Sequence, residues 1–292
     1  MKAPGTVTPS FVLKRVLSGL ELMPPKEKVL TMNFRFLSYR LDDLAQNVQI
    51  RKPDFQMSSS AKATSYPIRA IRYWWVAQAL SRELINKPNA TIVDMGAGHG
   101  QMRGYCAGSM SCISPEYPFD SQRWIALDKV CESRSSLANY SRIVECDFDN
   151  PLPLEANSVD ALICIHVMEH LLRPEFAVSE IARVLAPGGI FLGGSPAAPA
   201  PVSFFLHRWL RNKMRNGTTG PNGHINSFCP GDWKNLVSKA GLKLDFLSGS
   251  HFMRLSGSAI ENSQTWAKLN LFWGGLFPSL GSEVYLQAHK EV

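Results

Sequence analysis

Residues 91–100 read TIVDMGAGHG: a short apolar segment runs into an aspartate, and three glycines then follow at alternate positions. The segment 91–95 has the length and the β-branched content of a buried strand. Glycine lets a backbone turn sharply and lets another molecule approach it closely. The stretch therefore predicts a strand that leads into a loop lying against a cofactor.

Short apolar segments alternate with helical segments over most of the chain. Such alternation is typical of an α/β protein with a doubly wound, mostly parallel sheet. The last apolar segment alternates in polarity, so we expect it to join the sheet as an antiparallel strand. The expected strands are 91–95, 123–128, 141–147, 159–166, 189–195, 241–249 and 283–290. The expected helices are 67–85, 175–186 and 231–241, and the first has an apolar side made of Ile71, Trp74, Trp75, Ala77 and Leu80.

The positive charge of the chain is concentrated in its first third. Residues 1–90 carry 14 Lys/Arg against 6 Asp/Glu, whereas 91–292 carry 17 against 18. We expect a basic N-terminal extension over 1–65, followed by one domain over 66–292. The basic part suits an anionic neighbour, such as a phosphorylated substrate, an acidic membrane surface or nucleic acid, or else forms a solvated face.

Other sequence features point to a protein that works in the cytoplasm. No run of about 18 apolar residues could span a membrane. Lys14 and Arg15 interrupt the position where a secretion signal would have its apolar core. The cysteines form no CxxC pair and read as free thiols in a reducing compartment, although two in one loop, Cys106 and Cys112, could approach each other. The six cysteines are Cys106, Cys112, Cys131, Cys146, Cys164 and Cys229.

Three acids stand at the ends of three consecutive predicted strands: Asp94, Asp128 and Asp147. The intervening G-x-G-x-G pattern lacks the last glycine of a dinucleotide fingerprint and the Gly-Lys-Ser/Thr of a phosphate loop. An acid at the second strand end suits ribose hydroxyls, and an acid at the third suits an adenine amino group. Together with a carboxylate for a cationic amino acid, this set suits S-adenosylmethionine.

At these positions the chain resembles the class I S-adenosylmethionine-dependent methyltransferases. The resemblance rests on VDMGAGHG (93–100), ALD (126–128), CDFDNPLPLEANSVDALICIHVMEHL (146–171) and EIARVLAPGGIFLGGSP (180–196), and extends over 224–242 and 278–290. It implies the seven-stranded, Rossmann-like methyltransferase fold and a methyl transfer to an acceptor by in-line displacement at oxygen or nitrogen. The resemblance assigns these residues to the cofactor: Asp94, Gly96, Ala97 and Gly98 to its methionine end, Asp128 and Lys129 to its ribose, Asp147 and Phe148 to its adenine, and Ile165 and His166 to the surroundings of its sulfonium.

The interval from Gly100 to Asp128 departs from this family, because it is longer than the usual helix-plus-strand crossover. It includes CAGSMSCISPEYPFDSQ, whose Gly, Ser and Pro content disfavours a helix. We therefore expect a short helix followed by an irregular insert.

The segment HVMEH (166–170) also matches the H-x-x-E-H motif of zinc hydrolases, with Glu169 as general base. That alternative requires a helix through both histidines, whereas His166 reads as a strand end, so no metal ligand is assigned. A non-catalytic binding module with the same fold is a further alternative, which the retained acids disfavour. Nucleic-acid methylation lacks its usual aromatic motif after the fourth strand.

An oxygen acceptor needs a base, for which His166, His170 and His224 are candidates. We assign the catalytic role to His224 and His170, with a preference for His224. It follows an insert, 196–223, that is expected to overhang the site as a lid. Aromatic and basic residues mix in this insert, which favours a small anionic acceptor, or a lipid- or sugar-type one, and peripheral contact with a membrane. The mixed residues are Phe204, Phe205, Leu206, Trp209 and Leu210, beside Arg208, Arg211, Lys213 and Arg215.

Overall fold

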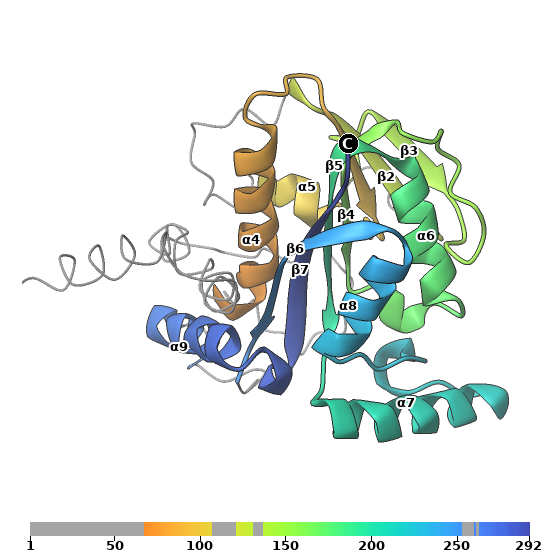
Figure 1. Cartoon of the computed structure of the whole chain (residues 1–292), viewed down its shortest axis with the longest axis vertical. Helices are drawn as coiled ribbons and strands as arrows, with labels where there is room; N and C mark the ends of the chain where they lie inside the picture. The colour runs from red at the N-terminus through yellow and green to blue at the C-terminus, as the bar shows by residue number, and fades with distance from the viewer. Residues whose placement is uncertain (1–66, 107–120, 131–136, 253–259, 261–262) are drawn as a thin grey trace, which may run out of the picture.

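A computed structural model describes residues 67–106, 121–130, 137–252, 260 and 263–292. Within them, seven strands form one sheet in the order β3-β2-β1-β4-β5-β7-β6 (Figure 1). The first five strands run parallel, and β7 is antiparallel to both of its neighbours. The predicted fold class is therefore confirmed. The strands are β1 (Thr91–Met95), β2 (Arg123–Asp128), β3 (Arg142–Glu145), β4 (Val159–Ile165), β5 (Leu185–Pro196), β6 (Leu242–Ser250) and β7 (Glu283–Lys290).

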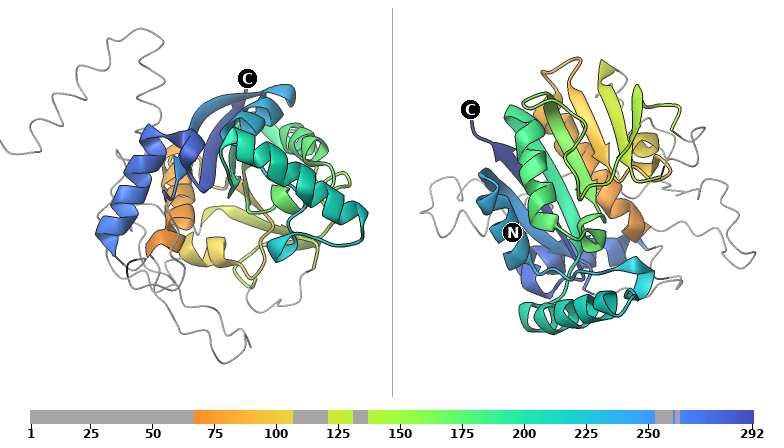
Figure 2. Two further views of the ribbon diagram at one scale, coloured as in Figure 1. Left: turned by 90° about the horizontal axis from the view of Figure 1, so that it is seen from below. Right: turned by 90° about the vertical axis from the view of Figure 1, so that its right-hand side faces the viewer.

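Helices cover both faces of the sheet (Figures 1 and 2). One face carries α4 (Pro67–Leu84), α5 (Gln101–Cys106) and α9 (Gln264–Leu276), and the other carries α6 (Pro174–Val184) and α8 (Pro230–Lys239). A further helix, α7 (Ala200–Arg215), follows β5 and lies beyond the end of the sheet at which β5 finishes. Three short 3-10 turns complete the described elements: Met168–His170, Pro221–Gly223 and Pro278–Leu280.

The α4 face of the sheet has an aromatic core. The apolar side chains predicted to line the first helix are all buried. Trp75 packs against Tyr285 of β7, with ring centroids 5.3 Å apart, and against Phe246 of β6. Burying a large apolar side chain contributes roughly 1.5–3 kcal/mol, so this contact anchors α4 firmly on the sheet. The residues just after α4's first turn, Arg72 and Tyr73, are thereby fixed near the end of β1.

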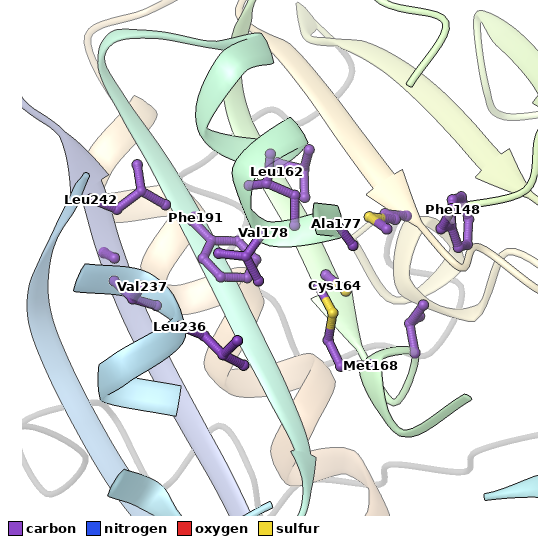
Figure 3. Packing of buried hydrophobic residues seen from close by; sticks show 14 of the residues in the cluster. Phe148, Leu162, Cys164, Met168, Ala177, Val178, Phe191, Leu236, Val237 and Leu242 are labelled. Carbon is purple, nitrogen blue, oxygen red and sulfur yellow. The ribbon is translucent and has the colours of Figure 1, made fainter. Parts of the chain in front are cut away.

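The second core lies between the sheet and the pair α6 and α8 (Figure 3). Val178 from α6, Val237 from α8 and Phe191 from β5 all belong to this core. Trp233 of α8 is fully buried and donates a hydrogen bond from Nε1 to Ser195 Oγ at 2.8 Å. Side chains alternate between the two faces along each strand, which is why neighbours in sequence contribute to different cores.

Several boundaries differ from the predicted ones. The fourth strand ends at Ile165, one residue earlier, and β5 begins at Leu185, four residues before the predicted start. The crossover after the glycines begins with the six-residue helix α5, as expected, while the predicted insert lies largely outside the described residues. The basic extension, Cys112 and Cys131 also lie outside them. The four described cysteines are free thiols, and none of the described helices is both long and apolar enough to cross a bilayer.

Candidate functional site

The glycine loop after β1 is held in place by the end of β2. All three glycines have positive φ, at 80°, 53° and 72°, in the left-handed region that other residues rarely adopt. The amides of Gly96 and Ala97 donate to the Leu127 carbonyl at 2.8 and 3.1 Å. Asp128 accepts hydrogen bonds from the Gly98 amide and from the Lys129 amide, each at 2.7 Å. The acid predicted for ribose therefore lies beside the loop predicted for methionine.

A small pocket opens between this loop, α4 and β4. Its volume is about 60 Å³, and its lining includes Arg72, Tyr73, Asp94, Gly96 and Ile165. A guanidinium and a carboxylate in one pocket provide complementary partners for the carboxylate and the ammonium of a free amino acid. The pocket therefore fits the methionine end of the expected cofactor. Sequence reasoning missed Arg72 and Tyr73, because only the packing of α4 on the sheet brings them here.

Asp94 is the carboxylate of this pocket. Its side chain is buried, and its Oδ2 accepts a hydrogen bond from the hydroxyl of Tyr140. Burial raises the pKa of Asp94 to about 6, although the bond from Tyr140 acts in the opposite direction. A cationic ligand would offset the cost of ionising a carboxyl group here. Tyr140, 46 residues further along the chain, was another residue that the sequence did not reveal.

The remaining cofactor candidates lie at the ends of β2, β3 and β4. Lys129 Nζ pairs with Asp147 Oδ2 at 2.9 Å, in an exposed position. The backbone amide of Asp149 and the Lys129 ammonium lower the pKa of Asp147. Phe148 is only 5% exposed and packs in the α6 core, so little of its ring faces outward (Figure 3). The roles of Lys129 at a ribose and of Asp147 and Phe148 at an adenine stay predictions.

A buried group of charges surrounds His166 at the end of β4. His166 has a φ of 59°, and its Nε2 lies 3.5 Å from Glu283 Oε1, while Nδ1 lies 3.4 Å from Glu169 Oε1. Arg72 Nη2 lies 3.6 Å from the same Glu283 oxygen. Burial and Arg72 lower the pKa of His166, but Glu283 and Glu169 outweigh them, so the pKa is raised. The surroundings of Ile165 are therefore strongly polar on one side, next to the pocket.

The two histidines predicted as catalytic lie together. His170 belongs to the turn Met168–His170 and His224 follows the turn Pro221–Gly223. Their ring centroids are 5.0 Å apart with an edge-to-face angle of 74°. Burial lowers the pKa of His224. Residues 54 positions apart thus form one polar surface beyond the end of β4.

The segment HVMEH does not have the conformation that the zinc-hydrolase motif requires. His166 follows the last residue of β4 and has a positive φ, and Met168–His170 form only a single 3-10 turn. The two histidines of the motif therefore do not share the face of an α-helix, which the motif requires.

The predicted lid insert contains α7, and its aromatic residues face solvent. Phe204, Phe205 and Trp209 are 64%, 69% and 45% exposed. Lys213 Nζ lies 4.4 Å from the centre of the Trp209 ring, so aromatic and basic groups alternate on one surface. Ser203 and Leu210 on the opposite side are buried.

Known proteins share parts of this sequence and this architecture. Residues 93–193 match a family model described as a methyltransferase domain. An uncharacterized 37.1 kDa protein in transposon TN4556 of Streptomyces fradiae is 31% identical over 111 residues, which are 38% of this chain and 31% of that protein. The chain therefore matches about a third of the length of this relative.

Two solved structures share the fold. A proposed sarcosine dimethylglycine methyltransferase from Galdieria sulphuraria aligns with a TM-score of 0.53 and 16% identity, covering 77% of this chain and 86% of that one. The CurJ carbon methyltransferase aligns with a TM-score of 0.52 and 14% identity, covering 99% of this chain and 72% of that one.

Proposed function

We propose that this chain, which carries a class I S-adenosylmethionine-dependent methyltransferase domain, transfers a methyl group to an oxygen or nitrogen of a small acceptor. The observation that carries the proposal is a contact between two parts of the site. Gly96, which lines the Asp94 pocket, packs closely against Val167, three residues before His170. The ring of His170 in turn packs against the ring of His224. A cofactor pocket and a polar acceptor surface are therefore neighbours.

The chemistry of each side chain in the site suggests its role. Asp94 and Arg72 would hold the two charges of the amino-acid end, and Asp128 would accept hydrogen bonds from ribose hydroxyls. When bound, S-adenosylmethionine supplies an electrophilic methyl group. Holding an acceptor in line with that group can account for much of the rate. His224 and His170 then lie where an imidazole could take the proton that the acceptor loses.

Support for a particular class of acceptor comes from α7. Its exposed Phe204, Phe205 and Trp209 stand beside Arg208 and Arg211. Apolar rings with adjacent guanidinium groups suit an acceptor that combines a negative group with a lipid or other apolar part. We propose such an acceptor, reached at a membrane surface or in solution, over a nucleic acid, because the sequence HVMEHL stands after β4 in place of the aromatic motif of nucleic-acid methyltransferases.

Calorimetric titration with S-adenosylhomocysteine tests the cofactor site. Asp128→Ala should lower the affinity roughly 10- to 150-fold, because a charged acceptor is worth about 1.5–3 kcal/mol. The matched control is Asp160→Ala, which removes another half-buried carboxylate that accepts from a backbone amide, that of Thr91 at 2.9 Å. Wild-type chain that binds no S-adenosylhomocysteine would contradict the proposal, as would equal losses in the two variants.

A further inference from the structure

A buried carboxylate without hydrogen bonds stands beside the two neighbouring histidines. Glu169 is 1% exposed, and neither of its carboxylate oxygens has a hydrogen-bond partner among the described residues. Burying a charge in this way costs several kcal/mol unless an opposite charge compensates it. His166 Nδ1, at 3.4 Å from Oε1, offers one partial compensation and leaves the second oxygen open.

Glu169, His170 and His224 form a ligand set of the kind that metal ions use. One oxygen of Glu169 and one ring nitrogen of each histidine all lie within 4.8 Å of one another. Two imidazoles and one carboxylate are the protein ligands of many catalytic zinc and non-haem iron sites. Such sites keep further coordination positions open, and here His170 is exposed and His224 half-buried, so a ligand can reach the group from solvent.

The backbone around this set is firmly fixed. The amides of Ile225 and Asn226 donate to the Glu169 carbonyl at 2.9 and 3.0 Å. Asn226 Nδ2 donates to the carbonyls of Met168 and Leu171 at 3.0 and 2.7 Å. These four bonds join the turn that carries Glu169 and His170 to the segment that carries His224. The set is therefore organised by the fold and not by chance proximity of two loops.

One histidine also has the outer partner that metal-binding histidines use. His170 Nδ1 lies 3.3 Å from the Gly223 carbonyl oxygen. When Nδ1 donates its proton to this carbonyl, Nε2 is unprotonated and free to coordinate. Gly223 has a φ of 79°, and a Cβ there would stand 3.7 Å from Nδ1, so the loop approaches the ring closely.

We propose that Glu169, His170 and His224 bind one divalent transition-metal ion, with open positions that take an oxygen of the methyl acceptor. The metal site stands on these three residues alone, whereas its role toward the acceptor rests on the proposed function. A metal ion at this site would favour an acceptor with a hydroxyl group. The acceptor oxygen would bond to the methyl carbon as the S–C bond breaks, and its proton would leave to water. With the ion bound, the histidines act as ligands, and water takes the proton that an imidazole would take in the metal-free site.

Metal binding is measured directly on the full-length chain stripped with a chelator. Titration with Co²⁺ should give visible absorption bands that saturate at one ion per chain, and Zn²⁺ should displace it. Glu169→Gln, His170→Ala and His224→Ala should each weaken binding on the order of 100-fold, at least the loss seen when outer partners of metal ligands are removed. The matched control is His289→Ala, which removes a histidine paired with the carboxylate of Asp245 on the far end of β7 and should bind as the wild type does.

Two outcomes overturn the metal site. In the first, the wild type binds Co²⁺ no better than a variant that carries all three substitutions. In the second, the single variants His170→Ala and His224→Ala bind Co²⁺ as well as the wild type. These two replace solvent-accessible side chains, so thermal unfolding near the wild-type temperature should show that they fold even if Glu169→Gln does not. Titration of the metal-free chain with S-adenosylhomocysteine separates the two proposals. If the chain binds S-adenosylhomocysteine but no metal ion, the metal site alone is overturned. If the chain binds the metal ion but no S-adenosylhomocysteine, the proposed function alone is overturned.

Discussion

Gly96 lies so close to Val167 that a Cβ atom at position 96 would stand 2.2 Å from Val167 Cγ2. Val167 is 8% exposed and directly follows His166, so the side chain cannot move away without disturbing the end of β4. The glycine loop and the turn that carries Glu169 and His170 therefore form one unit. A change in the loop should reach the acceptor side of the site through this contact.

Gly96→Ala tests this contact. The new methyl group must displace either Val167 or the loop, so we expect S-adenosylhomocysteine affinity to fall at least tenfold, about 1.4 kcal/mol. Gly241→Ala is the matched control, because Gly241 also has a positive φ, at 76°, but its Cβ would meet nothing within 4 Å. The control should lose about 1 kcal/mol of folding stability and keep its affinity. Calorimetry that finds the two variants equally weak would contradict the role of the contact.

Asp94 should make the stability of the ligand-free chain depend on pH. Its pKa in the folded chain is about 6, above the ordinary 3.8, because of burial. A raised pKa means that its contribution to stability is fully present below about 3.8 and is lost as the pH rises through about 6. Asp94→Asn does not titrate, so at pH 8 we expect its free energy of unfolding to exceed that of the wild type by on the order of 1–3 kcal/mol. It should then also unfold at a higher temperature, and the difference should nearly vanish near pH 3.5.

The same variant should lose cofactor affinity, since the amide offers no negative charge to an ammonium group. Thermal melts between pH 3.5 and 8, with and without S-adenosylhomocysteine, measure both effects. Asp160→Asn serves as control, because Asp160 is a half-buried carboxylate that accepts a hydrogen bond from the Thr91 amide, away from the pocket. A gap between Asp94→Asn and wild type that stays constant with pH would contradict the assignment.

Sequence alone could predict the strands and the acids at their ends, because both follow from local patterns. The apolar segment 91–95 and the glycines after it need only their neighbours to be recognised. Arg72 and Tyr140 could not be found in this way. They reach the Asp94 pocket through the packing of α4 and through a hydrogen bond across 46 positions, and neither leaves a periodic signal in the chain.

The segment HVMEH illustrates the opposite problem, because its spacing has a meaning that depends on its conformation. On an α-helix His166 and His170 would share a face, but the strand end and the short turn separate them and bring His170 to His224 instead. The pairing is set by hydrogen bonds such as those of Asn226, whose significance only the tertiary structure reveals.

Asn226→Ala should destabilise the chain and loosen the pair of histidines. The buried side chain satisfies two backbone carbonyls, and leaving such groups unpaired costs roughly 1–3 kcal/mol each. We therefore expect a fall of about 2–4 kcal/mol in the free energy of unfolding, measured by urea denaturation. Asn235→Ala, at an exposed position on α8, should change it by less than about 0.5 kcal/mol. An Asn226→Ala chain as stable as this control would refute the tie between the two segments.

The exposed rings of α7 should help the chain bind to a surface of anionic lipid. Phe205 is 69% exposed and its ring meets that of Phe204 edge to face, at 5.5 Å, so both can insert together into a lipid interface. Phe205→Ser should weaken binding to vesicles of anionic lipid at least about tenfold in a sedimentation assay, since burying one such ring is worth about 1.5–3 kcal/mol. Added salt should weaken vesicle binding of the wild type and of Phe205→Ser alike, because the arginines of α7 contribute by their charge.

The control variant is Phe252→Ser. It removes a phenylalanine that is 49% exposed and packs against Trp273 of α9, so it should bind vesicles as the wild type does. Equal binding by Phe205→Ser and wild type would leave α7 without a role at membranes, and the acceptor would then be sought among small water-soluble anions.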